Sequence, residues 1–176
     1  MGKRLVIENG GPKGEPYTDP GGKKYFKAIF WTRIFNGTDT PLEYSIDFPA
    51  DAYELASSPG TYFTILLPPD TMTRAKEPLY NYGLTRLTSF LDSNMHAPPS
   101  LKRTINPNDS GGFFVLLLRP LATEAPGGIL RTALRLSGQN LFYRIARYDN
   151  TPAHALLYEK EIPCGRINLK GLVFRE

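Results

Sequence analysis

The side chains with the clearest potential for binding chemistry are arginines and aromatic residues in the last third of the chain. Arginines recur between positions 119 and 147, and Phe142 and Tyr148 lie among them or beside them. Guanidinium groups bind carboxylates and phosphates through paired hydrogen bonds, and aromatic planes stack on sugars, bases and guanidinium groups. A surface that combines the two would suit an anion, a sugar or a protein.

The excess positive charge of the chain lies in the same region. The 176 residues include 21 Lys+Arg and 17 Asp+Glu, which gives a formal net charge of +4. Residues 1–118 contain 12 basic and 12 acidic residues, so the remaining 9 basic and 5 acidic residues of 119–176 carry the whole excess. An excess of this size argues against a nucleic-acid partner, because binding to the phosphate backbone needs many positive charges.

A two-residue turn at Gly138-Gln139 would join these residues in one hairpin. Glycine at the first central position suits a type II′ turn, and Leu134 then faces Tyr143 on an apolar face. A three-residue turn would shift the register by one and mismatch that core face. On the preferred register, the opposite face carries the candidate ligand-binding residues: Arg131, Arg135, Phe142, Arg144 and Tyr148. The alternative interpretation is a solvated sheet face on which arginines stack over aromatic rings and discourage edge pairing.

Catalytic and metal-binding patterns are missing from the sequence. Its two histidines, His96 and His154, lack the spacing that places two metal ligands on one face. Its single cysteine, Cys164, excludes an internal disulfide and a cysteine-based zinc cluster, and we expect a buried, inert thiol. We therefore predict no catalytic residue, no metal and no cofactor, and a binding protein in preference to an enzyme.

The elements that would position these residues are mostly strands. The chain contains 16 Gly, 16 Pro, 10 Tyr and 10 Phe, a composition that favours frequent turns between aromatic and β-branched strands. Leu42–Phe48 alternates cleanly, whereas Phe113–Leu118 is apolar on both faces and belongs in the interior. The predicted strands are 26–35, 42–48, 62–67, 101–105, 113–119, 129–137, 141–148, 155–162 and 171–175.

One segment has helical spacing instead. Leu84, Leu87, Phe90 and Leu91 recur at the helical period, which predicts one helix near residues 79–92 with a break near Gly83. About nine strands with one helix predict a mainly β fold. We expect an antiparallel β-sandwich of the immunoglobulin-like or jelly-roll type.

The first 24 residues differ in composition from the rest. Residues 10–24 are rich in glycine and proline and poor in large apolar side chains. Such a segment buries little surface to offset its ordering entropy, so we expect residues 1–24 to form a flexible arm or an extended edge. Residues 25–176 would then form a single β-sandwich domain, with Trp31 in its core.

The sequence leaves the compartment open. It contains no run of 18 apolar residues that could span a membrane and no recognisable secretory signal. A cytoplasmic protein and a mature secreted or periplasmic form are both compatible with this. Two segments, Asn36-Gly37-Thr38 and Asn108-Asp109-Ser110, match the short acceptor pattern for N-linked glycans.

These observations lead to one principal functional hypothesis. We expect a non-catalytic β-sandwich module that binds a protein or carbohydrate partner or packs within an assembly, with its oligomeric state left open. The alternative is a carbohydrate-active or other hydrolase on a jelly-roll-like scaffold, using loop carboxylates such as Asp47, Asp70 or Asp109. Further candidate contact residues are the loop aromatics Tyr53, Tyr62, Tyr80 and Tyr82.

Overall fold

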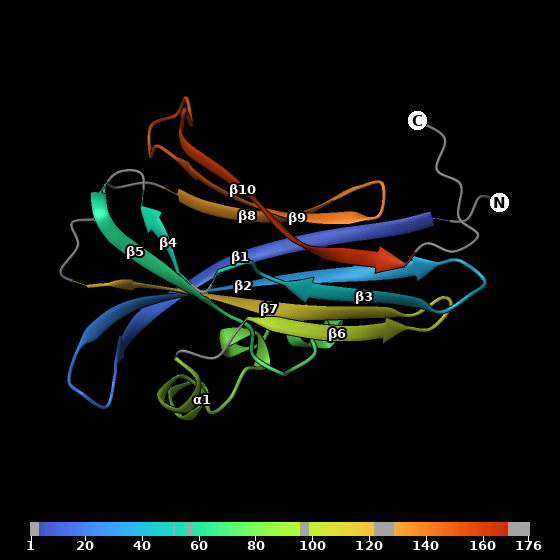
Figure 1. Cartoon of the computed structure of the whole chain (residues 1–176), viewed down its shortest axis with the longest axis horizontal. Coiled ribbons are helices and arrows are strands. Elements are labelled where there is room, and N and C mark those ends of the chain that lie inside the picture. Colours follow the sequence, from blue (N-terminus) through green and yellow to red (C-terminus); the bar gives the residue numbers. More distant parts are fainter. Residues whose placement is uncertain (1–3, 51, 56–57, 96–98, 122–128, 169–176) are drawn as a thin grey trace.

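The computed structural model describes residues 4–50, 52–55, 58–95, 99–121 and 129–168, and every structural statement below refers to them. They form two antiparallel five-stranded sheets and one α-helix, so the expectation of a mainly β, sandwich-like fold is confirmed (Figure 1). The first sheet has the strand order β1-β2-β7-β5-β4, and the second has the order β6-β3-β10-β9-β8.

The bounds of the elements follow the chain. The strands are β1 (Arg4–Thr18), β2 (Lys24–Gly37), β3 (Leu42–Asp47), β4 (Ala52–Leu55), β5 (Ser58–Leu66), β6 (Ser100–Ile105), β7 (Ser110–Pro120), β8 (Ile129–Ser137), β9 (Asn140–Tyr148) and β10 (Leu156–Asn168). Two short 3₁₀ helices, η1 (Arg74–Lys76) and η2 (Tyr80–Gly83), precede the helix α1 (Leu87–Asn94).

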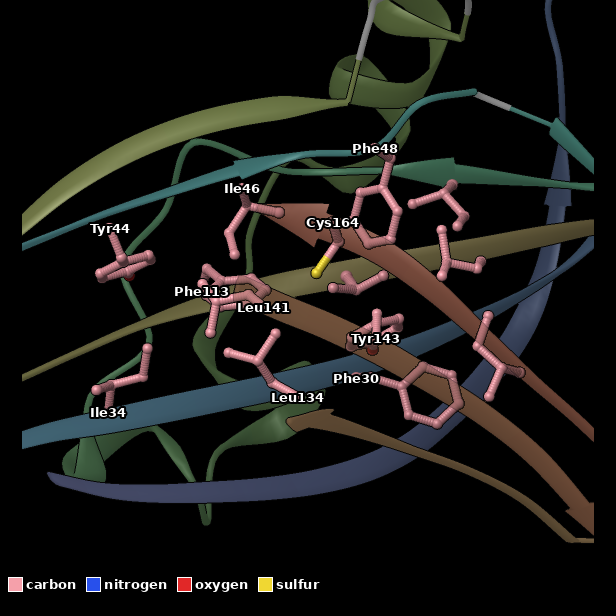
Figure 2. Close-up of a cluster of buried hydrophobic side chains, with 14 of the residues drawn as sticks. Phe30, Ile34, Tyr44, Ile46, Phe48, Phe113, Leu134, Leu141, Tyr143 and Cys164 are labelled. Atoms are coloured by element: carbon pink, nitrogen blue, oxygen red, sulfur yellow. The ribbon is translucent and has the colours of Figure 1, made fainter. Parts of the chain in front are cut away.

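The main hydrophobic core lies between the two sheets. Alternate residues of β2 and β7, such as Phe30 and Phe113, meet side chains of the second sheet such as Tyr143. Cys164 is completely buried beside Phe48 in this core, as the sequence predicted (Figure 2). Each large apolar side chain removed from water in this way contributes about 1.5–3 kcal/mol to folding.

A second core lies on the other face of the first sheet. There, the remaining alternate residues of β2 and β7 pack under residues 68–95, which we call the cover and which include α1 (Figure 1). Ile29, Trp31 and Phe114 of the sheet meet Leu87 and Leu91 of α1. The two-sided apolar pattern of β2 and β7 therefore has a direct cause, because both faces of these strands are buried.

The beginning of the chain forms a strand. Residues 4–18 form the edge strand β1, hydrogen-bonded along β2, so this part of the expected flexible arm takes the alternative form of an extended edge. Its glycines allow close packing. A Cβ atom on Gly10 would lie 2.4 Å from the Trp31 ring, and one on Gly14 would lie 2.4 Å from the Phe26 ring. Glycine is therefore required at positions 10 and 14 because the backbone of β1 lies directly against aromatic rings of β2.

The helix prediction was right in type and wrong in extent. The α-helix covers only residues 87–94, and the preceding turn departs from helical geometry at Asn81, Tyr82 and Arg86, whose φ values are 48°, 54° and 59°. Residues in the left-handed conformation interrupt the helical hydrogen bonds. The helical spacing of apolar residues therefore begins before the helix itself does. The structure also adds β1 and β4 to the predicted strands, and the strand predicted at 171–175 lies outside the described residues.

Candidate functional site

The hairpin of β8 and β9 has the register that the two-residue turn predicted. Ser137 opposes Asn140, and Leu134 opposes Tyr143 on the face that enters the main core. Gly138 has a φ of 62°, the positive value that a type II′ turn requires at its first central position.

All five predicted site residues lie together on the outer face of the second sheet. Arg131 and Arg135 on β8 are exposed, whereas Phe142, Arg144 and Tyr148 on β9 are half-buried. The guanidinium of Arg144 lies 6.0 Å from the centre of the Tyr148 ring and donates to the Tyr148 hydroxyl at 3.1 Å.

Two glutamates of β10 neutralise most of this positive charge. Arg144 Nε lies 2.7 Å from Glu159 Oε1, and an Arg135 amino group lies 3.1 Å from Glu161 Oε2. The hydrogen bond to Glu159 raises the pKa of Arg144 and lowers the pKa of Glu159. Sequence reasoning missed both glutamates, because β10 pairs with β9 through two register shifts that no sequence pattern marks.

Two of the three guanidinium groups on this face therefore contact carboxylates of the same sheet. Arg131 donates to the neighbouring backbone carbonyl of Leu130 at 3.1 Å. Ala146 lies between Arg131 and Glu159 in the same row and is completely buried, as expected when the aliphatic stems of long side chains lie over a sheet.

The other two arginines of the basic region occupy a different place. Arg119 and Arg147 are half-buried, and the Arg119 guanidinium lies 5.0 Å from the centre of the Phe26 ring. Burial lowers the pKa of both guanidinium groups, and the charge of Arg147 lowers the pKa of Arg119 further. The five arginines between positions 119 and 147 are thus divided between the outer face and these two half-buried positions.

A different surface feature, residues 79–83, stands out in the structure. We call this segment the Tyr80 turn. Asn81, Tyr82 and Gly83 all have positive φ values, of 48°, 54° and 75°. Such a conformation is rare for a bulky residue such as tyrosine and persists only where surrounding contacts hold it.

The contacts of Tyr82 supply part of that support. Its ring is buried and meets Trp31 edge-on, with 6.3 Å between ring centres and an interplanar angle of 77°. The ammonium of Lys13 lies 4.3 Å from the centre of the Tyr82 ring and donates to the Leu79 carbonyl at 2.8 Å. Lys13 of the edge strand β1 therefore binds both the backbone and an aromatic ring of the turn and holds it against the first sheet.

Glu15 supplies the rest of the support. Its carboxylate accepts hydrogen bonds from the Tyr80 hydroxyl at 3.0 Å and from Asn81 Nδ2 at 3.2 Å. The same carboxylate lies 2.7 Å from Lys27 Nζ, whose side chain is only 3% exposed. The bond to Lys27 is the largest cause that lowers the pKa of Glu15.

This network holds two large apolar side chains at the surface. Tyr80 is 80% exposed and Leu79 is 49% exposed. The sequence named Tyr80 among several loop aromatics but placed it inside a helix. The available signal was the Asn81-Tyr82-Gly83 run, since asparagine and glycine tolerate left-handed backbone better than other residues do.

The other candidate aromatics are distributed differently. Tyr62 is 52% exposed on β5, whereas Tyr53 is half-buried and stacks on Phe63 with 5.7 Å between ring centres. Trp31 is 5% exposed and belongs to the second core, which confirms its predicted place in the interior.

The three carboxylates of the hydrolase alternative lie on or beside different elements. Asp47 ends β3, Asp70 lies in the cover, and Asp109 accepts the backbone N–H of Ser110 in the turn between β6 and β7. Burial raises the pKa of the Cys164 thiol to about 12, so the nucleophilic thiolate does not form at neutral pH. The described part of the chain contains no group of three or more His, Cys, Asp or Glu residues that could hold a metal ion.

Comparison with protein families, curated proteins and solved structures gives no match to this chain. Within the described ranges, no helix is long and apolar enough to cross a membrane.

Proposed function

We propose that the chain is a non-catalytic β-sandwich module, of the immunoglobulin-like or jelly-roll type, that binds a protein partner through the Tyr80 turn. The observation that carries this proposal is an aromatic side chain, 80% exposed, that directly precedes the left-handed residues 81–83 and is held by the carboxylate of Glu15. Strained backbone of this kind clusters at binding sites, where the surrounding structure offsets its cost.

The physical argument rests on preorganisation. A tyrosine already fixed by its hydroxyl loses little conformational freedom when a partner covers it, so more of the contact energy appears as affinity. Tyrosine is also enriched among the few interface residues that dominate binding energy. Leu79 beside it enlarges the apolar contact, and Lys13 and Glu15 provide a polar border. A folded protein with an apolar pocket suits such a projection.

The arginine face supports a weaker case for partner binding. Two of its three guanidinium groups already contact glutamates of the same sheet. An anionic ligand would have to replace those glutamates. Replacing one exposed ion pair by another contributes little to the free energy of binding. The Tyr80 turn needs no such exchange.

The experiment is site-specific photocrosslinking in the cells that make this protein. A photoreactive phenylalanine analogue replaces Tyr80 in one variant and Tyr62 in the matched control, because both tyrosines are exposed but lie on different elements. We expect a discrete protein adduct from position 80 that is missing from position 62. The same adducts from both positions, none from either, or a defined glycan as the bound species would contradict the proposal.

A further inference from the structure

The two glycan-acceptor patterns of the chain lie in opposite environments. In the first, Asn36 is completely buried. Its Nδ2 donates to the carbonyls of Thr40 and Ile105, both at 2.9 Å. Its Oδ1 accepts from the backbone N–H of Thr38 at 3.0 Å and from the Thr38 hydroxyl at 2.6 Å. Both polar atoms of the Asn36 side chain and the Thr38 hydroxyl are therefore committed to internal hydrogen bonds.

The second pattern lies in the turn between β6 and β7, at one end of the molecule (Figure 1). Asn108, Asp109 and Ser110 are all exposed. Among the described residues, the Asn108 carboxamide and the Ser110 hydroxyl make no hydrogen bond, whereas the Asp109 carboxylate accepts the Ser110 backbone N–H at 2.8 Å.

The backbone of this turn is nevertheless well anchored. The N–H of Asn108 donates to the Asn36 carbonyl at 2.7 Å, and the N–H of Asn36 donates to the Asp109 carbonyl at 2.9 Å. Asn108 has a φ of 60°, a conformation that asparagine tolerates. The fold thus displays the Asn108 side chain on a fixed turn and removes the Asn36 side chain from solvent.

We propose that Asn108 is an acceptor for an N-linked oligosaccharide when the chain enters a secretory compartment, and that the folded protein carries no glycan at Asn36. The donor is an oligosaccharide linked to a polyprenyl diphosphate. Asn108 Nδ2 forms a bond to the anomeric carbon of the first sugar, and the bond from that carbon to the diphosphate oxygen breaks. The diphosphate leaves with the electron pair, and Nδ2 loses one proton.

The cost of modification separates the two sites. A glycan on Asn108 extends into solvent without replacing any side-chain hydrogen bond. A glycan on Asn36 would require a bulky group at a buried position and would leave buried carbonyl groups without their donors, each at a cost of about 1–3 kcal/mol. A chain modified at Asn36 would fail to reach this fold, so the folded fraction is expected to lack that modification.

The test expresses the full chain behind a secretion leader in a eukaryotic cell and maps glycopeptides in the folded, protease-resistant fraction. We expect a glycan on Asn108 and none on Asn36. Asn108→Gln and Ser110→Ala should each abolish modification, whereas Asn106→Gln, an exposed neighbour outside the pattern, should retain it. An unmodified Asn108, or a glycan on Asn36 in the folded fraction, would overturn the proposal. Neither result depends on the Tyr80 turn.

Discussion

The hydroxyl of Tyr80 donates to the carboxylate of Glu15 at 3.0 Å, although 65 residues separate them in the chain. Glu15 lies on the edge strand β1 and Tyr80 lies on the cover. The glycine- and proline-rich composition of β1 predicts a flexible segment, and residues 79–83 fall within the predicted helix. The hydrogen bond joins these two segments. The central feature of the proposed binding surface therefore depends on a contact between two segments whose local patterns are both misleading.

Replacing Glu15 by Gln should destabilise the protein, because Lys27 would be left buried without its counter-ion. We expect a loss of about 3 kcal/mol, at the low end of the range for a broken buried pair since Glu15 itself is partly exposed. Urea unfolding of Glu15→Gln measures this loss. The double variant with Lys27→Met should recover much of it, and a double variant as unstable as the single one would contradict the ion-pair explanation.

The same carboxylate makes the stability depend on pH. The folded-state pKa of Glu15 is lowered from the ordinary value of 4.5, first by its bond to Lys27. Stability from this group is therefore present above the unfolded-state pKa and is lost as the pH falls through the lower, folded-state value. Unfolding of the wild type should become easier below about pH 4.5, with a smaller change in Glu15→Gln. Parallel curves for the two proteins would show that other carboxylates determine the effect.

Gly10 should not accept a side chain. In Gly10→Ala the new Cβ atom would lie 2.4 Å from the Trp31 ring, so the strand or the ring must move. Overpacking of this type costs about 1–3 kcal/mol. Gly21→Ala is the control, because its Cβ atom would approach only Asp19 Oδ1, at 3.4 Å. Thermal unfolding should show a lower Tm for Gly10→Ala than for the wild type, and an unchanged Tm for Gly21→Ala. Equal Tm values for the two variants would contradict the close packing of β1 on Trp31.

Two core tyrosines should respond differently to loss of the hydroxyl. Among the residues that the structure describes, the buried Tyr44 hydroxyl has no hydrogen-bond partner, whereas the Tyr143 hydroxyl donates to Thr132 Oγ1 at 2.9 Å. Tyr44→Phe should therefore be neutral or stabilising, and Tyr143→Phe should cost about 1 kcal/mol. Denaturant unfolding of both variants measures the difference. If Tyr44→Phe lost more unfolding free energy than Tyr143→Phe, the Tyr44 hydroxyl would have to make a hydrogen bond, which would contradict this prediction.

Local reasoning succeeded where the determining contacts are local. A two-residue turn at Gly138 fixes the register of β8 and β9, and the alternation of the flanking residues assigns each face correctly. The five predicted site residues were therefore placed on one face. Their partners Glu159 and Glu161 were not found, because the register of β10 is set by shifts around Tyr158 and Pro163 that depend on packing.

Distant contacts account for the remaining errors. Glycines at positions 10 and 14 indicate flexibility in isolation, but here they make room for Trp31 and Phe26. The left-handed conformation of Tyr82 is held by contacts with Trp31 and Lys13, which no pattern within the cover reveals. Both features are stabilised by residues far away in the sequence, and single-sequence periodicity does not report such contacts.

The most direct test of the central claim is the affinity of the crosslinked partner for variants of the Tyr80 turn. Isothermal titration with Tyr80→Ala should show a Kd at least about 30-fold weaker than that of the wild type, as expected for a dominant interface residue. Tyr62→Ala should change the Kd less than about threefold, as expected for a residue outside the interface. Circular dichroism should show that both variants are folded. Unchanged affinity in a folded Tyr80→Ala variant would contradict the assignment of this turn as the binding surface.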